Sequence, residues 1–325
     1  MNLESNHKAG KGPARGGQQI IFVCGALRSG TTLLRLMLKH HLQMSNPGEM
    51  DFLFECPTGA DGKRDIEAYK SFLRLNRIFC ATGLPIDETL DYTDLVHSFV
   101  AGVRQPGKVM SVNLHRNFER VPEIFPDARY IHLLRDPRDV ARSSIGMGWA
   151  GNVYHGVDHW IDSERSFEKL EGQIGADKIY SLKNEDLIAD AERALTPLCA
   201  FMGVPYDARM LTYPENSTYS APDVALVNQW RRLQSEREVG LVEGKVGMML
   251  RARGYEPSGY KVLIPNRFER MRLQTGNRIG RLRTVLRRYG PVLTGLDIVS
   301  RRLPLPGLRE VVQRRMNEKA VQFLK

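Results

Sequence analysis

Residues 25–32, Gly-Ala-Leu-Arg-Ser-Gly-Thr-Thr, have the composition of a loop that binds phosphate. They are close to the pattern G-x-x-x-x-G-K-[ST], in which glycines permit a tight backbone path and free N–H groups surround the anion. Thr31 stands where that pattern has a lysine, and a cation stands three residues earlier, at Arg28. Either a nucleotide loop has lost its lysine, or the loop binds a different phosphate ester.

The side chains of this loop argue against a magnesium-bound triphosphate. In nucleoside triphosphatases the missing lysine spans the β- and γ-phosphates, and the next Ser or Thr holds magnesium. Arg28 instead supplies a permanent cation that can bind an oxyanion through two parallel hydrogen bonds. Ser29, Thr31 and Thr32 add hydroxyl donors. A plain glycine-rich turn is the alternative, but packing alone does not explain four small polar residues around a cation.

A second cationic turn follows the segment Ile-His-Leu-Leu at 131–134. Arg135 ends this predicted strand, and Ser143 lies eight residues later in a predicted helix that has Asp136 as N-cap and Pro137 as first residue. Ligands of parallel α/β sheets bind at the carboxyl ends of strands. The two turns can therefore hold two phosphates of one nucleotide, although this one alone could be a salt-bridged surface turn.

Apolar periodicity predicts the elements that position both turns. Predicted strands and helices alternate, which indicates a parallel sheet with helices on both faces. The predicted fold is α/β and P-loop-like, with three layers around a central parallel sheet. The predicted strands are 20–26, 108–114 and 128–134, and residues 178–187 are predicted to form a further strand and a turn. The predicted helices are 33–42, 65–80, 87–103 and 188–202.

Two segments, RSGTTLLRLML at 28–38 and FPDARYIHLLRDPRDVARSS at 125–144, resemble the sulfotransferase superfamily in its bacterial, P-loop-like form. Its members use 3′-phosphoadenosine 5′-phosphosulfate (PAPS), and the likeness covers about residues 19–255. The resemblance implies that the first loop binds the 5′-phosphosulfate, through Arg28, Ser29, Gly30, Thr31 and Thr32. It also implies that Arg135 and Ser143 bind the 3′-phosphate.

The resemblance further implies in-line transfer of a sulfuryl group to a hydroxyl, less readily an amine, of a carbohydrate, lipid or small metabolite. Arg28 would stabilise charge on the bridging oxygen, and no metal is required. Glu49 is the expected general base, because some members carry a catalytic Glu at a similar distance after the loop. His115 is the rival, because cytosolic members use a His after their second strand. Glu49 could instead be a surface residue of a Pro-Gly turn.

The sequence departs from the superfamily pattern in several places. Residues 110–112, Met-Ser-Val, stand where many members have Lys-Thr-Pro, and Lys108 replaces that lysine only if the strand shifts. Asn184 stands where members often have Tyr, and Arg251 and Arg253 are candidates to replace a missing glycine-rich motif for the 3′-phosphate. A P-loop kinase or other phosphotransferase and a non-catalytic nucleotide-binding protein therefore stay open. The acceptor pocket or the core could contain Trp149, Tyr154, His155 and Trp160.

Charge divides the chain unevenly. The net charge is +10, yet residues 251–325 alone hold 18 Lys and Arg against 5 Asp and Glu, so the basic character belongs to the last quarter. We expect a disordered lead-in over 1–18, a sulfotransferase domain over 19–255 and a basic helical extension over 256–325. No apolar run approaches the roughly 20 residues of a membrane-spanning helix, and residues 1–18 contain no apolar signal core. These features predict a cytoplasmic protein.

The basic extension has an amphipathic pattern. One helical face would carry apolar residues and the rest arginines, which suits a helix on the inner, anionic face of a membrane. The apolar residues are Phe268, Met271, Ile279, Leu282 and Leu286. A helix packed on the domain with a solvated arginine face is the alternative. We expect no nucleic-acid partner, because aromatic residues are scarce here and no known binding pattern is present.

Overall fold

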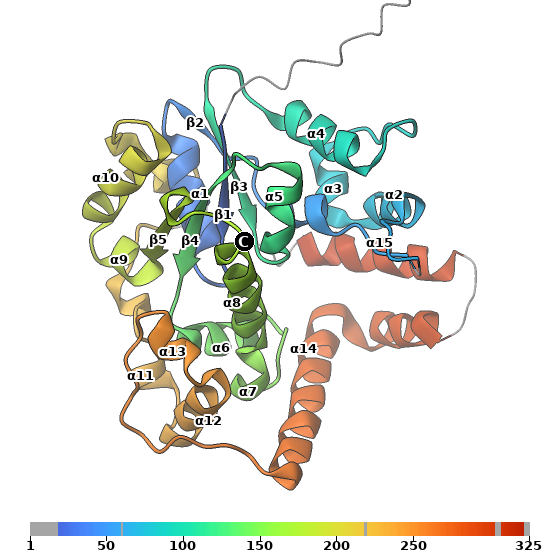
Figure 1. Cartoon of the computed structure of the whole chain (residues 1–325). Coiled ribbons are helices and arrows are strands. Elements are labelled where there is room, and N and C mark those ends of the chain that lie inside the picture. The colour runs from blue at the N-terminus through green and yellow to red at the C-terminus, as the bar shows by residue number, and fades with distance from the viewer. Residues whose placement is uncertain (1–18, 60, 218–219, 303–306, 322–325) are drawn as a thin grey trace, which may run out of the picture.

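The computed structural model describes residues 19–59, 61–217, 220–302 and 307–321. Its centre is a parallel five-stranded sheet in the order β2-β3-β1-β4-β5, with helices on both faces (Figure 1). The predicted α/β fold is confirmed. The strands are β1 (Ile20–Cys24), β2 (Met44–Ser45), β3 (Val109–Leu114), β4 (Arg129–Leu134) and β5 (Ile179–Lys183).

Strand β1 is apolar throughout because it is buried on both faces, as is usual for the central strand of a parallel sheet. On one face Phe22 packs edge-on against Phe54, in a cluster that includes side chains of helices α2, α3, α4 and α8. On the other face Ile21 and Val23 pack with Leu34 of α1 and with side chains of α10. These helices are α1 (Thr31–His40), α2 (Ile66–Leu75), α3 (Arg77–Thr82), α4 (Tyr92–Val103), α8 (Asp158–Glu171) and α10 (Ala191–Met202).

Several predicted boundaries shift for local reasons. Helix α1 begins two residues early, at Thr31, directly after Gly30 in the left-handed region. The helix predicted over 65–80 is broken at Asn76, whose side chain accepts hydrogen bonds from the first N–H groups of α3. Within the strand and turn predicted over 178–187, the strand ends at Lys183, and α9 (Asn184–Ala189) takes the place of the turn.

A buried ion network fixes the helix that follows β4. Helix α6 (Pro137–Gly146) has Asp136 as its N-cap, as predicted. The Arg138 guanidinium donates to Asp136 at 2.6 Å and to Glu243 of α12 at 2.7 Å, and it lies over the Trp230 ring. The network therefore joins α6 to the last third of the chain. The other α-helices between residues 121 and 252 are α5 (Val121–Ile124), α7 (Val153–Gly156), α11 (Trp230–Leu233), α12 (Glu236–Val246) and α13 (Met249–Ala252).

Residues 255–266 contain neither helix nor strand and lead into two helices, α14 (Arg267–Arg302) and α15 (Leu308–Val321). Helix α14 bends at Gly290, where φ is 80°, just before Pro291, and its second half lies beside α15 (Figure 1). The division of the chain at 255/256 stays a prediction. The predicted lead-in, 1–18, falls outside the described residues. Among the described helices, none combines the length and apolarity that crossing a bilayer requires.

A buried carboxyl group at the start of α6 gives the fold a pH-dependent term. Asp139 is 2% exposed and accepts a hydrogen bond from the Trp230 N–H at 2.7 Å, while its Oδ2 has no partner among the described residues. Burial raises the pKa of Asp139 to about 6, against the attraction of Arg135. The native state therefore binds this proton more tightly than the unfolded chain does. The stabilisation is complete below about pH 4 and is lost as the pH rises through about 6.

Asp139→Asn removes this ionisation and keeps an acceptor for the Trp230 N–H. We expect the free energy of unfolding of the variant, relative to the wild type, to rise by about 1–3 kcal/mol between about pH 4 and pH 8. Urea unfolding across that range measures the difference, and Asp127→Asn, at an exposed position, is the matched control. A difference that does not change with pH would contradict this account.

Candidate active site

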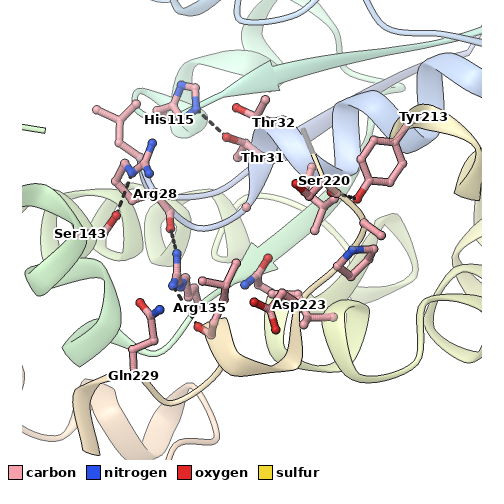
Figure 2. A pocket seen from close by; sticks show the side chains of 18 of the residues that line it. Arg28, Thr31, Thr32, His115, Arg135, Ser143, Tyr213, Ser220, Asp223 and Gln229 are labelled. Atoms are coloured by element: carbon pink, nitrogen blue, oxygen red, sulfur yellow. Dashed lines mark hydrogen bonds between the residues drawn. The ribbon is translucent and has the colours of Figure 1, made fainter. Parts of the chain in front are cut away.

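A cavity of about 290 Å³ lies where the carboxyl ends of four strands meet. The turn after β1 contributes Arg28, the end of β3 contributes His115, and the end of β4 contributes Arg135 (Figure 2). The end of β5 contributes Asn184. The sheet thus brings together residues that lie far apart in the sequence. The predicted site residues that line the cavity are Arg28, Gly30, Thr31, Thr32, Glu49, Arg135 and Ser143.

Arg28 links the two predicted turns. Its backbone is in the left-handed region, with φ of 74°, which is uncommon for a residue other than glycine. Its Nε donates to Ser143 Oγ at 2.9 Å, and its carbonyl oxygen accepts from Arg135 Nη1 at 2.9 Å (Figure 2). Trp160 Nε1 in turn donates to the carbonyl of Arg135 at 3.0 Å. Both arginines and the serine are therefore held in one hydrogen-bonded unit.

The N-terminus of α1 opens onto the same cavity. The first hydrogen bond within the helix runs from the Leu34 N–H to the Gly30 carbonyl, so the N–H groups of residues 31–33 precede it. Thr31, Thr32 and Leu33 all line the cavity. Orphan N–H groups and the positive end of a helix dipole make such an end a site for anions.

Ser29 lies behind this loop and does not line the cavity. Its N–H donates to the Ala26 carbonyl at 3.0 Å, and its hydroxyl is buried without a partner among the described residues. In this arrangement the Ser29 N–H closes the turn, and the contact of Ser29 with a nucleotide stays a prediction.

A buried histidine and aspartate border the cavity on the side of β3. His115 Nδ1 lies 2.8 Å from Asp51 Oδ2, and the His115 N–H donates to Asp51 Oδ1 at 2.7 Å. His115 Nε2 lies 3.3 Å from Thr31 Oγ1. Burial opposes both charges, yet the attraction and hydrogen bonds of the pair prevail, so the pKa of His115 is raised and that of Asp51 is lowered. The pair therefore favours the imidazolium form of His115 and the carboxylate form of Asp51.

Glu49 reaches the cavity from a segment that runs beside β3. The Asn113 N–H donates to the Gly48 carbonyl at 3.0 Å, and the Met50 N–H donates to the Asn113 carbonyl at 3.1 Å. The Glu49 side chain lines the cavity. Its carboxylate forms no hydrogen bond or ion pair with other described residues, and its negative charge contributes to the raised pKa of His115.

Asn184, a departure from the superfamily pattern, lies deep in the site. It is 3% exposed, and its Oδ1 has no partner among the described residues. A Cβ at Gly30 would lie 2.0 Å from that oxygen. Gly30 is therefore required twice, for its φ of 91° and for the approach of Asn184.

Other candidates from the sequence lie elsewhere. Lys108 precedes β3 at the amino end of the sheet and does not line the cavity, so it does not replace the family lysine. Arg251 is exposed beside Glu256, and Arg253 pairs with Glu164 at 2.6 Å, so neither arginine reaches the site.

Of the four aromatic candidates for the acceptor pocket, Trp149 alone lines this cavity. Trp160 is buried and supports Arg135. Tyr154 and His155 border a separate hollow beside α14.

Sequence reasoning missed one wall of the cavity. Residues 220–223 line it together with Leu226 and Gln229. The Tyr213 hydroxyl donates to the Ser220 carbonyl at 2.8 Å, and Arg135 Nη2 lies 3.5 Å from the Leu226 carbonyl (Figure 2). This segment has little regular structure and no motif, so its position depends on contacts that the local sequence does not encode.

Comparison with known proteins decides the family. Residues 20–208, more than half of the chain, match the family model described as the sulfotransferase family. The chain belongs to the sulfotransferase family. This confirms the resemblance seen in the two turns, and it identifies the chain as an enzyme of the transferase class.

Curated relatives match in part. An uncharacterized protein of Aquifex aeolicus is 25% identical over 254 residues, which are 69% of this sulfotransferase and 32% of that protein. Omega-hydroxy-beta-dihydromenaquinone-9 sulfotransferase Stf3 of Mycobacterium tuberculosis is 30% identical over 95 residues, 25% of this chain and 24% of the relative. The match therefore spans about a third or less of these relatives.

Solved structures share the fold. The sulfotransferase domain of the olefin synthase of Synechococcus PCC 7002 has a TM-score of 0.51 at 21% identity, covering 73% of this chain and 98% of that one. The sulfotransferase domain of the curacin biosynthetic pathway has a TM-score of 0.55 at 18% identity, with the same coverage.

Gly30→Ala tests the close approach of the first loop to Asn184. We expect the variant to lose about 1–3 kcal/mol of unfolding free energy, because alanine is strained at this φ and its methyl group overlaps the amide. Chemical denaturation measures the loss. Gly295→Ala, at an open position within α14, is the matched control and should be neutral or stabilising. Equal stability of the two variants would show that the loop does not need glycine.

Proposed function

We propose that this sulfotransferase moves a sulfuryl group from PAPS to a hydroxyl group of its acceptor. The observation that carries the proposal is the convergence of two donor sets on one cavity. The N-terminus of α1 with Arg28 forms one set, and Arg135 with Ser143 forms the other. PAPS carries anionic groups at its 5′ and 3′ positions, and a nucleotide with two separated anions suits two separated donor sets.

The residues present fit such a nucleotide. Residues 31 and 32 would bind the 5′-phosphosulfate through N–H and hydroxyl groups. Arg135 and Ser143 would bind the 3′-phosphate, and the Ser143 hydroxyl can donate to it while accepting from Arg28. The orphaned Oδ1 of Asn184 offers a buried acceptor beside the loop. Arg28 would stabilise negative charge on the oxygen that leaves sulfur.

The transfer needs a general base for the acceptor, and its leaving group is the bisphosphate nucleotide. The acceptor oxygen forms a bond to sulfur, the bond from sulfur to the bridging oxygen breaks, and the acceptor proton leaves. We assign that proton to Glu49, whose carboxylate faces the cavity without a partner among the described residues. The products are a sulfate ester and 3′-phosphoadenosine 5′-phosphate (PAP).

We assign His115 the role of a cation rather than a base. Asp51 holds it by two hydrogen bonds and favours its protonated form, and its Nε2 points at the N-terminus of α1. An imidazolium there would supply a positive charge in place of the lysine of the Lys-Thr-Pro triplet, which many family members have and which this chain lacks. It would stabilise charge on the transferring group.

The proposed acceptor is a carbohydrate, a lipid or a small metabolite. A lipid is supported by the partial match to a sulfotransferase named for a menaquinone. The cavity walls also include apolar side chains, namely Leu27, Leu33, Trp149, Ile188 and Leu226. No group of three or more metal-ligating side chains occurs within the described ranges, and independence from metals stays a prediction.

The assignment of the 3′-phosphate can be tested by binding. Arg135→Ala and Ser143→Ala should each weaken PAP binding by roughly 10- to 100-fold, the effect of losing a charge-assisted hydrogen bond. Binding of adenosine 5′-phosphate, which lacks the 3′ group, should change much less. Titration calorimetry measures both, with the exposed Arg165→Ala on α8 as control. Equal losses for both nucleotides would refute the assignment, and tight binding of magnesium ATP without PAP binding would favour a kinase.

The division between base and cation can be tested by pH. Glu49→Gln should lower transfer of radiolabelled sulfate from PAPS into a cell extract by roughly 100- to 10,000-fold while leaving PAP binding nearly unchanged. Since His115 must stay protonated, the wild-type rate should fall as the pH rises through the raised pKa of this imidazole. Asp51→Asn should move that fall to lower pH. A rate that instead rises through the titration of His115 would make His115 the base.

A further inference from the structure

The first half of α14 carries an apolar stripe that nothing in the described structure covers. Phe268 is 80% exposed and Met271 61% exposed. The stripe consists of Phe268, Met271, Ile279, Leu282 and Leu286, which recur at helical spacing along one side. Half of the large apolar side chains that are exposed within the described ranges lie in α14 and α15. Such a concentration marks a binding surface rather than scattered surface residues.

The opposite side of α14 holds the helix on the domain. The Gly151 N–H donates to Asn277 Oδ1 at 2.7 Å, and Asn152 Nδ2 donates to the Leu273 carbonyl at 2.8 Å. A Cβ at Gly280 would lie 2.5 Å from Gly151 Cα, so the two backbones are in close contact. Because this side is fixed to the loop 148–152, the stripe is turned away from the domain.

Arginines border the stripe and define the charge of its partner. Residues 267–290 contain eight arginines and one acidic residue, Glu269, which pairs with Arg237. Two copies of this helix placed stripe to stripe would bring like charges together. An anionic apolar surface meets both the stripe and the arginines, and the lipid bilayer is the common surface of that kind.

A shallow hollow of about 520 Å³ lies next to the stripe, between α7 and α14. Arg270 and Arg278 border it together with His155, and Met271 of the stripe forms part of its wall. The Arg270 Nε donates to the Pro265 carbonyl, and Arg278 forms no ion pair with the other described residues. The two guanidinium groups that border the hollow are therefore available to an anionic group that enters beside the stripe.

We propose that the first half of α14 lies in the interface of an anionic membrane. The stripe enters the acyl region, the bordering arginines contact lipid phosphates, and the hollow receives one headgroup phosphate. This inference stands without the proposed reaction. Trp149, which lines the cavity, lies on the loop that α14 holds.

Vesicle sedimentation of the full chain tests the proposal. Wild-type protein should bind vesicles of phosphatidylcholine with phosphatidylglycerol, lose binding in high salt, and bind phosphatidylcholine alone at least roughly tenfold less. Phe268→Ser with Leu282→Ser should lower the partition coefficient roughly tenfold or more, through lost apolar burial. Arg272→Gln with Arg283→Gln should lower it on anionic vesicles only.

Matched controls keep the test specific. Met248→Ser with Leu42→Ser removes exposed apolar side chains elsewhere, and Arg165→Gln with Arg193→Gln removes exposed charge elsewhere. Both pairs should bind vesicles like the wild type, and all variants should keep the wild-type melting temperature. Equal binding to neutral and anionic vesicles would overturn the proposal. So would a wild-type dimer, seen by analytical ultracentrifugation, that the stripe variant abolishes in a protein that binds no vesicles.

Discussion

The site depends on one constraint, the left-handed backbone of Arg28. This conformation is costly for a residue with a side chain, and it persists because neighbouring groups fix it from both sides. Arg135 donates to the Arg28 carbonyl, and Ser143 accepts from its guanidinium. The ends of β1 and β4 are therefore joined by side chains that also face the cavity. The ion network of Arg138 and the hydrogen bond from Trp160 hold the second turn in place.

The cations of the site gather at the strand ends, and the Glu49 carboxylate stays available beside them. Arg28, Arg135 and the N-terminus of α1 gather positive charge at the strand ends. The Asp51 carboxylate is occupied by His115, whereas Glu49 has no such partner among the described residues. Two carboxylates two residues apart thus have different environments, one that holds a proton on an imidazole and one that can take a proton from an acceptor.

Local sequence predicted the parts of this structure that depend on local physics. The buried strand β1, the glycine at position 30, the N-cap at Asp136 and the apolar side of α14 all follow from short-range patterns. The parallel sheet then brought the two predicted turns together, as the rule for strand ends requires. Ser29, in contrast, was predicted from its hydroxyl and from the family resemblance, and the direction of its side chain depends on the turn.

The remaining features depend on contacts between distant segments. Asp51 meets His115 because an irregular stretch is held along β3, and residues 220–229 lie over the cavity through single hydrogen bonds. In the sequence, Lys108 lies close to position 110, where many family members have a lysine. In the structure, the strand register puts Lys108 at the amino end of β3, away from the cavity. In the sequence, Asn184 is a departure from the family pattern. In the structure, the absence of a side chain at Gly30 makes room for Asn184.

A crystal structure of the complex with PAP tests the central claim most directly. The account predicts the 5′-phosphate at the N-terminus of α1 beside Arg28, and the 3′-phosphate between Arg135 and Ser143. A nucleotide bound elsewhere, or bound with its 3′-phosphate away from Arg135 and Ser143, would contradict it.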